Sequence, residues 1–123
     1  MEIRELNHVA LHVADVESSC EFYRTVLQLE QLPRPEFSFP GAWFRLGAGQ
    51  ELHLIGGRSA ELADHGRRNH YALLVDDMPA WVNRLEQSGV VFEGPLSRPD
   101  GARQVFLQDP DGHFIELCTS PPS

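Results

Sequence analysis

Two nine-residue segments of this chain resemble each other, and each opens with a histidine. Residues 8–16 (HVALHVADV) return 62 positions later as residues 70–78 (HYALLVDDM), with five of nine positions identical. His53 follows His8 by 45 residues, and Glu116 follows His70 by 46. Each copy therefore supplies one imidazole near its start and a second side chain able to bind a metal near its end.

The chemistry of these four side chains is that of a divalent metal site. Three imidazoles and one carboxylate suit zinc, nickel, cobalt, iron or manganese better than calcium or magnesium, which prefer oxygen ligands. Any one of the four alone would be better explained as a strand imidazole or a surface carboxylate. Their matching places in both copies favour one ion bound by His8, His53, His70 and Glu116.

The first copy predicts a strand, a helix and a hairpin. Residues 6–14 alternate in polarity, so His8 and His12 share one face. Asp15 is a candidate N-cap for an amphipathic helix that runs to about Leu29. Strands follow at 42–46 and 51–55. His12 is a residue that supports a metal ligand, a substrate-side residue or a structural histidine, the last being favoured.

The second copy predicts the same order of elements. A strand over 70–75 leads into a helix capped by Asp76 or Asp77 and stopped by Gly89. A short strand at 90–92, a turn region at 94–101 and a hairpin of 103–108 with 113–119 follow. Residues 43–46 align with 105–108, which puts one extra residue inside the second hairpin. No role is assigned to His65 or His113.

Composition limits the function classes. The formal charge is −8, with ten arginines and eighteen acidic residues among 123, which argues against a nucleic-acid or anionic-membrane partner. No apolar run approaches a membrane span and the N-terminus lacks signal-peptide features, so we expect a cytoplasmic protein. We expect one domain over 1–123, with modules at about 4–56 and 68–119. Cys20 and Cys118 form no metal or redox spacing and are expected to be reduced, buried thiols.

Two further segments hold candidate substrate-binding residues. The proline-rich stretch 30–41 contains Arg34, Phe37 and Phe39, and it forms either a wall of a ligand site or a hydrophobic flap over the core. Arg103, just before an expected strand, is a candidate for binding an anionic group. Residues 56–69, with several arginines, form a solvated linker or meet an anionic substrate.

Three stretches of the sequence resemble the vicinal oxygen chelate superfamily, also called the glyoxalase/bleomycin-resistance/dioxygenase superfamily. They are residues 6–15 (LNHVALHVAD), 22–29 (FYRTVLQL) and 106–117 (FLQDPDGHFIEL). The resemblance implies an α+β fold of two tandem βαβββ modules that form a cupped half-barrel around one metal, often completed in a homodimer. It also places the ligands at His8, His53, His70 and Glu116, although typical glyoxalase I has Glu where this chain has His53.

The resemblance implies a metal-dependent lyase or isomerase of glyoxalase I type that acts on a small-molecule substrate. Glu116 is the expected general base, His53 is its alternative, and Arg103 and Phe37 are the expected substrate contacts. Rival functions are an extradiol-type dioxygenase, a thiol transferase and a drug-binding dimer of the bleomycin-resistance kind. The thiol transferase would have Thr where this chain has Ala10, and a proton-transferring epimerase stays open.

Overall fold

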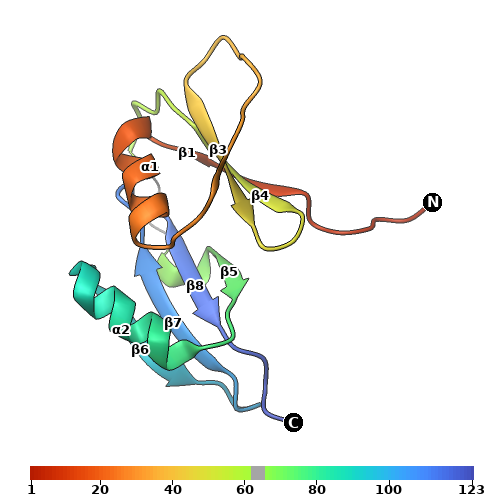
Figure 1. Ribbon diagram of the computed structural model, residues 1–123, viewed down its shortest axis with the longest axis vertical. Helices are drawn as coiled ribbons and strands as arrows, with labels where there is room; N and C mark the ends of the chain where they lie inside the picture. The colour runs from red at the N-terminus through yellow and green to blue at the C-terminus, as the bar shows by residue number, and fades with distance from the viewer. Residues whose placement is uncertain (62–65) are drawn as a thin grey trace. The chain divides into compact units, whose positions relative to one another are not determined.

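The structure, a computed structural model, describes residues 1–61 and 66–123 (Figure 1). The chain divides into two compact units, Met1–Glu61 and Leu62–Ser123. Among the described residues, each unit contains one α-helix and one four-stranded sheet.

The first unit has the element order strand, helix and three strands. Its elements are β1 (His8–His12), α1 (Val16–Thr25), β2 (Gln31–Leu32), β3 (Gly41–Leu46) and β4 (Gln50–Ile55). The sheet order is β1-β4-β3-β2, in which β1 is parallel to β4 and the other neighbours are antiparallel. The first strand thus lies beside the last.

The second unit repeats this topology. After the short 3-10 helix η1 (Gly66–Arg68) come β5 (His70–Leu74), α2 (Met78–Ser88), β6 (Phe92–Ser97), β7 (Arg103–Gln108) and β8 (Phe114–Cys118). The sheet order is β5-β8-β7-β6, with β5 parallel to β8. The predicted α+β fold of two tandem βαβββ modules is confirmed.

Both helices begin at an aspartate, as predicted. The Asp15 carboxylate accepts a hydrogen bond from Ser18 N at 3.3 Å, and the Asp77 carboxylate accepts one from Ala80 N at 3.1 Å. These bonds satisfy amide groups that have no partner within the helix. Gly89 ends α2 in a left-handed conformation with φ 74°, which glycine adopts without steric cost.

Alternation along the strands separates a buried face from a face with polar side chains. In the first unit, Phe44, Leu52 and Leu54 are buried, and the Tyr23 ring of α1 lies 6.0 Å from that of Phe44. Val105, Leu107, Ile115 and Leu117 are the buried equivalents in the second sheet. In both sheets the residues between them, His53 and Glu116 included, point to the other face.

The strand register corrects the predicted internal alignment. Trp43 lies opposite His53, whereas Phe106 lies opposite Glu116. Trp43 is therefore equivalent to Phe106, not to Val105, and the extra residue of the second unit precedes β7. A one-residue error matters because it assigns a side chain to the wrong face of the sheet.

Two strands depart from the sequence expectations. β2 is a two-residue strand inside the proline-rich stretch 30–41, where no strand was predicted. β6 runs through Gly94 and Pro95, where a turn region was predicted. β6 is at the edge of its sheet and its pairing is irregular between Glu93 and Leu96, so it accommodates a proline without breaking a ladder. Part of the predicted linker, residues 62–65 with His65, lies outside the described residues.

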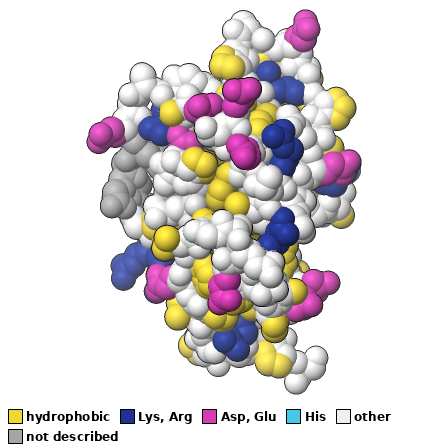
Figure 2. All heavy atoms as spheres, turned by 60° about the vertical axis from the view of Figure 1, so that its left-hand side comes forward, with side chains coloured by type: hydrophobic (Ala, Val, Ile, Leu, Met, Phe, Trp, Pro, Cys, Tyr) yellow, Lys and Arg dark blue, Asp and Glu magenta, His cyan; other side chains and the backbone are white. Residues whose placement is uncertain are grey.

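One face of the molecule carries interspersed charged side chains of both signs (Figure 2). On the face drawn in Figure 2, acidic groups and arginines alternate with uncharged groups and form no continuous field of one sign. Within the described part of the chain, no helix combines the length and apolar character needed to cross a membrane.

Candidate functional site

The second unit brings His70 and Glu116 together. His70 Nε2 lies 2.9 Å from Glu116 Oε1, and His70 Nδ1 lies 2.6 Å from the carbonyl oxygen of Arg67. A carbonyl can only accept, so Nδ1 carries the proton and donates it. Nε2 is then the ring nitrogen that faces the Glu116 carboxylate, within ion-pair distance of Oε1.

Glu116 is buried and is held by neighbours on its own sheet. Its residue is only 4% exposed, and Gln104 Nε2 donates to Oε2 at 3.3 Å. The two carboxylate oxygens therefore have different partners, His70 at one and Gln104 at the other. Burial, and then the charge of Glu116, raise the pKa of the nearby Cys118 thiol, which keeps it protonated beside the carboxylate.

The first unit brings His8 and His53 together in a different way. Their rings are stacked, with centroids 4.2 Å apart and planes inclined by 16°. His8 Nδ1 lies 2.8 Å from Asn7 Oδ1, which accepts its proton and leaves Nε2 as the free nitrogen. His8 and His70, at equivalent places in the two units, thus present the same ring nitrogen.

His53 is held on three sides. Trp43 stacks on the ring with centroids 4.1 Å apart and planes 4° from parallel, opposite the stack with His8. His53 Nε2 donates to Glu51 Oε1 at 2.8 Å. Since the lone pair of an imidazole nitrogen lies in the ring plane, two nearly parallel rings cannot both aim at one ion. For His8 and His53 to share an ion, one ring must turn.

The donor set fits a divalent metal by its chemistry. His8 and His70 each present Nε2 because an oxygen acceptor holds the other nitrogen, the usual arrangement that fixes a metal-binding histidine. Among the described residues, no group of three or more His, Cys, Asp and Glu side chains gathers closely enough to hold an ion. The four predicted ligands occur as two pairs, one in each unit.

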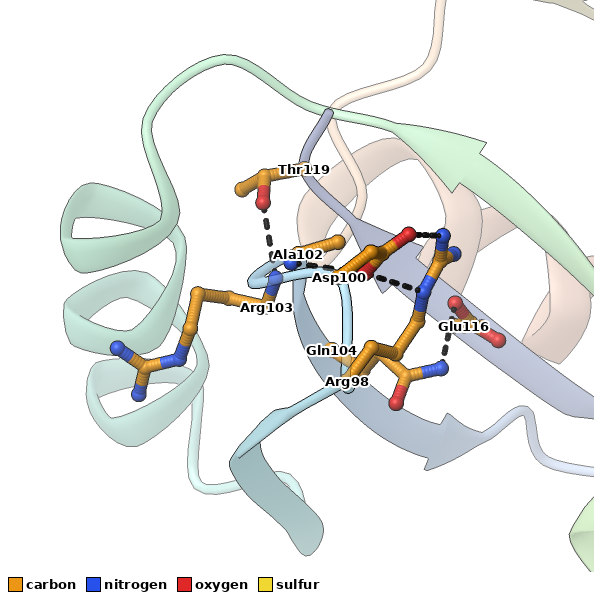
Figure 3. A network of polar contacts seen from close by, with 7 residues as sticks. All are labelled: Arg98, Asp100, Ala102, Arg103, Gln104, Glu116 and Thr119. Carbon is orange, nitrogen blue, oxygen red and sulfur yellow. Dashed lines mark hydrogen bonds and ion pairs between the residues drawn. The ribbon is translucent and has the colours of Figure 1, made fainter. Parts of the chain in front are cut away.

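The loop before β7 carries an arginine that is already neutralised (Figure 3). Arg98 donates to both oxygens of Asp100, and Asp100 also accepts from Ala102 N at 3.1 Å. These bonds raise the pKa of Arg98 and lower the pKa of Asp100. Glu116 acts on Arg98 only as a more distant charge.

The structure does not bring Arg103 to Glu116. Gln104 and Phe106 share the Glu116 face of the sheet, so Arg103 points to the other face. Figure 3 shows its guanidinium directed away from Glu116 toward α2. Its backbone N–H donates to Thr119 Oγ1 at 2.9 Å. The position of Arg103 just before a strand does not by itself fix the face of the sheet to which its side chain points.

Phe37, in contrast, belongs to a row of rings that leads to His53. Phe39 stacks on Phe37 with ring centroids 5.2 Å apart. The Phe37 centroid lies 6.2 Å from that of Trp43, which stacks on His53. Phe37 is 46% exposed. The sequence reasoning assigned no role to Trp43, Glu51 or Gln104, although alternation already placed Glu51 on the face of His53.

Comparisons with known proteins agree with this architecture. A family model described as Glyoxalase/Bleomycin resistance protein/Dioxygenase superfamily matches residues 5–117. Glyoxylase I 4 of Arabidopsis thaliana is 32% identical, covering 96% of this chain and 72% of its own length. A lactoylglutathione lyase of Salmonella typhimurium is 31% identical, and the match covers 91% of this chain and 90% of the relative.

Two further relatives broaden the comparison. Metallothiol transferase FosB of Bacillus licheniformis is 27% identical over 96% of this chain and 77% of its own length. The crystal structure of a glyoxalase family protein from Bacillus anthracis superposes with a TM-score of 0.85 at 26% identity, covering 98% of each chain.

Proposed function

Because the chain belongs to the glyoxalase/bleomycin resistance protein/dioxygenase superfamily, we propose that it is a metal-dependent lyase or isomerase of glyoxalase I type. The observation that carries the proposal is the His70–Glu116 pair, in which an imidazole nitrogen with a fixed tautomer faces a buried carboxylate at 2.9 Å. The names of two relatives, Glyoxylase I 4 and lactoylglutathione lyase, indicate the same reaction class.

The proposed ligands are His8, His70 and Glu116. The pair of the first unit and the pair of the second unit come either from one chain or from two chains of a homodimer. His53 is the fourth candidate and requires a turned ring. The bound ion, from the series zinc, nickel, cobalt, iron and manganese, would supply Lewis-acid stabilisation of negative charge on substrate oxygens.

Glu116 is the proposed general base. It removes the proton from the hydroxyl-bearing carbon next to the carbonyl group and returns it to the former carbonyl carbon. The hydroxyl proton passes from the oxygen of the first carbon to that of the second, so the hemithioacetal becomes a 2-hydroxy thioester with the same atoms. Gln104 positions the carboxylate by donating to Oε2. His53, oriented by Glu51 and Trp43, is the alternative base.

The test combines metal analysis with an activity assay. We expect the purified protein to contain, or to take up, about one divalent ion per pair of modules, and the nickel- or zinc-loaded protein to isomerise the adduct of methylglyoxal and glutathione. Size-exclusion chromatography with light scattering is expected to report a homodimer. A protein that binds no divalent ion under any loading condition contradicts the proposal and favours a drug-binding dimer.

A thiol transferase is the second candidate function. It is favoured by the similarity to metallothiol transferase FosB. Ala10 stands where such enzymes are expected to have Thr, which disfavours it. Modification of fosfomycin by a thiol in the presence of the manganese-loaded protein would favour this function over the lyase. Oxygen uptake with catechols on the iron-loaded protein would instead favour a dioxygenase.

A further inference from the structure

Arg34 lies at the end of the row of rings that leads to His53. Its guanidinium carbon is 4.7 Å from the centroid of Phe37 and 5.1 Å from that of Phe39, and its Nη2 donates to the carbonyl of Phe39 at 3.0 Å. Two ring faces and a carbonyl therefore fix the position of this cation. Such a fixed guanidinium loses little freedom when it binds a ligand.

Gly41 makes room for this arrangement. A Cβ at position 41 would lie 2.9 Å from Arg34 Nη2, 3.0 Å from Arg34 Nε and 2.3 Å from the carbonyl oxygen of Leu54. Any other residue would displace the guanidinium or the strand. Gly41 and Trp43 lie on the same strand face, so Arg34 rests on the side of the sheet that carries His53.

The equivalent region of the second unit shows what Arg34 lacks. Gly41 lies opposite Ile55 and Gln104 lies opposite Cys118, so Gly41 and Gln104 occupy equivalent positions. Each unit has an arginine in the loop before this position, Arg34 in one and Arg98 in the other. Arg98 is neutralised by Asp100, whereas no carboxylate in the described part of the chain pairs with Arg34.

A cation fixed in this way and left with unused N–H groups is suited to an anionic ligand. The guanidinium fork matches a carboxylate. The rings of Phe37 and Phe39, which are 46% and 41% exposed, lead with Trp43 from the cation toward His53 and offer an apolar surface. The net charge of −8 makes such a site the result of local geometry, not of the overall field.

We propose that Arg34 is a substrate-binding residue that pairs with a carboxylate on a substrate whose apolar or aromatic body lies along Phe37, Phe39 and Trp43. This inference rests on the proposed function in that it places the reacting end of the substrate near His53. It identifies the substrate class of the site as an apolar carboxylate.

The experiment compares two probes of nearly equal shape and different charge, 2-naphthoate and 2-naphthamide, on metal-free protein. The chain has two tryptophans, Trp43 and Trp81, so in the Trp81→Phe protein the fluorescence comes from Trp43 alone. We expect both probes to quench this fluorescence, with 2-naphthoate binding about tenfold more tightly or better, as a charge-assisted bidentate pair provides.

Three variants in this background separate binding from scaffolding. Arg34→Gln is expected to lower the affinity for 2-naphthoate to that for 2-naphthamide. The affinity for 2-naphthamide should stay within about twofold of its value before the substitution. Arg34→Lys keeps the charge without the fork and is expected to retain part of the preference. Arg45→Gln is the matched control, because Arg45 lies on the same strand face as Trp43 but is paired with Glu30, and it should keep the full preference.

Several outcomes overturn the inference. The first two are equal affinity for the two probes and no binding of 2-naphthoate. The third is a preference for 2-naphthoate that survives Arg34→Gln. The fourth is an equal loss of affinity for both probes in Arg34→Gln, which would make Arg34 a purely structural residue. Since no metal is present, a preference that depends on Arg34 stands even if the protein shows no lyase activity. Metal uptake and lyase activity without that preference would preserve the proposed function and remove this inference.

Discussion

The two units place different chemistry on the same scaffold. In both, the last strand pairs in parallel with the first, and position 53 or 116 lies opposite an alanine, Ala10 or Ala72. In the second unit that position holds Glu116, which faces His70. In the first it holds His53, which stacks on His8 and donates to Glu51.

Strand register determines where a side chain lies, while its neighbours determine what it can do. Glu116 has oxygens directed at a histidine nitrogen and at an amide, a suitable setting for a ligand and base. His53 has one nitrogen engaged by a carboxylate and both ring faces covered. We therefore expect the two equivalent positions to differ in function.

The sharpest test of this difference is a pair of substitutions at the equivalent positions. Glu116→Gln should reduce the proposed lyase activity by about 10²–10⁴-fold, the range for loss of a general base. His53→Gln should reduce it by about tenfold, as for a group that supports a metal site without forming it. Steady-state kinetics on metal-loaded protein would measure both, and equal losses would contradict the functional asymmetry.

Truncation of a buried side chain should lower the free energy of unfolding by similar amounts in the two sheets. Phe44 and Leu107 hold equivalent positions by register and are almost fully buried, at 0% and 2% exposed. We expect Phe44→Ala to lower the free energy of unfolding by about 3–5 kcal/mol and Leu107→Ala by about 2–5 kcal/mol. Urea unfolding followed by circular dichroism would check this. A loss below about 1 kcal/mol at either site would show that the equivalence does not extend to the cores.

The helix starts provide a smaller, matched comparison. Asp15 and Asp77 each accept a hydrogen bond from the amide three residues later. Replacing either with Ala should cost about 1 kcal/mol of unfolding free energy, since the amide loses its acceptor. The same urea titrations apply, with Glu17→Gln as a control in the first turn of α1 that leaves the cap intact.

The smallest effect is expected from the Arg98–Asp100 pair, which only the second unit has. The pKa of Asp100 is lowered in the folded state, mainly by Arg98, so its contribution to stability is present above the usual carboxyl range and is lost as pH falls through the folded-state pKa. Both side chains are about 40% exposed, so solvent screens the pair. The midpoint temperature of thermal unfolding, measured between pH 2 and pH 7, should be lower for Asp100→Asn near pH 7. Near pH 2 it should approach that of the unmodified protein.

Much of the fold could be predicted because its signals are local. Asp15, Asp77 and Gly89 mark helix ends by their own chemistry, and alternation marked the strands that carry His8 and His70. Most of β6 was missed, since a strand was predicted only at 90–92 and Gly94 and Pro95 indicate a turn wherever the strand is not known to lie at an edge.

The site was harder to predict because its details depend on register between distant strands. Alternation could place His53 and Glu51 on one face, but no sequence signal showed that Trp43 covers the His53 ring or that Gln104 reaches Glu116. Arg103 was selected by position along the chain, and the register then placed it on the other face. The pairing within each unit is now described, while the sharing of one ion by all four side chains stays a prediction.

The parallel pairing of first and last strands has a consequence for how the protein is made. The donors of a unit are 45 or 46 residues apart in sequence and become neighbours only when the final strand docks beside the first. Closing so long a loop costs entropy and slows folding. A nascent unit on the ribosome therefore has no assembled donor pair until its last strand has emerged.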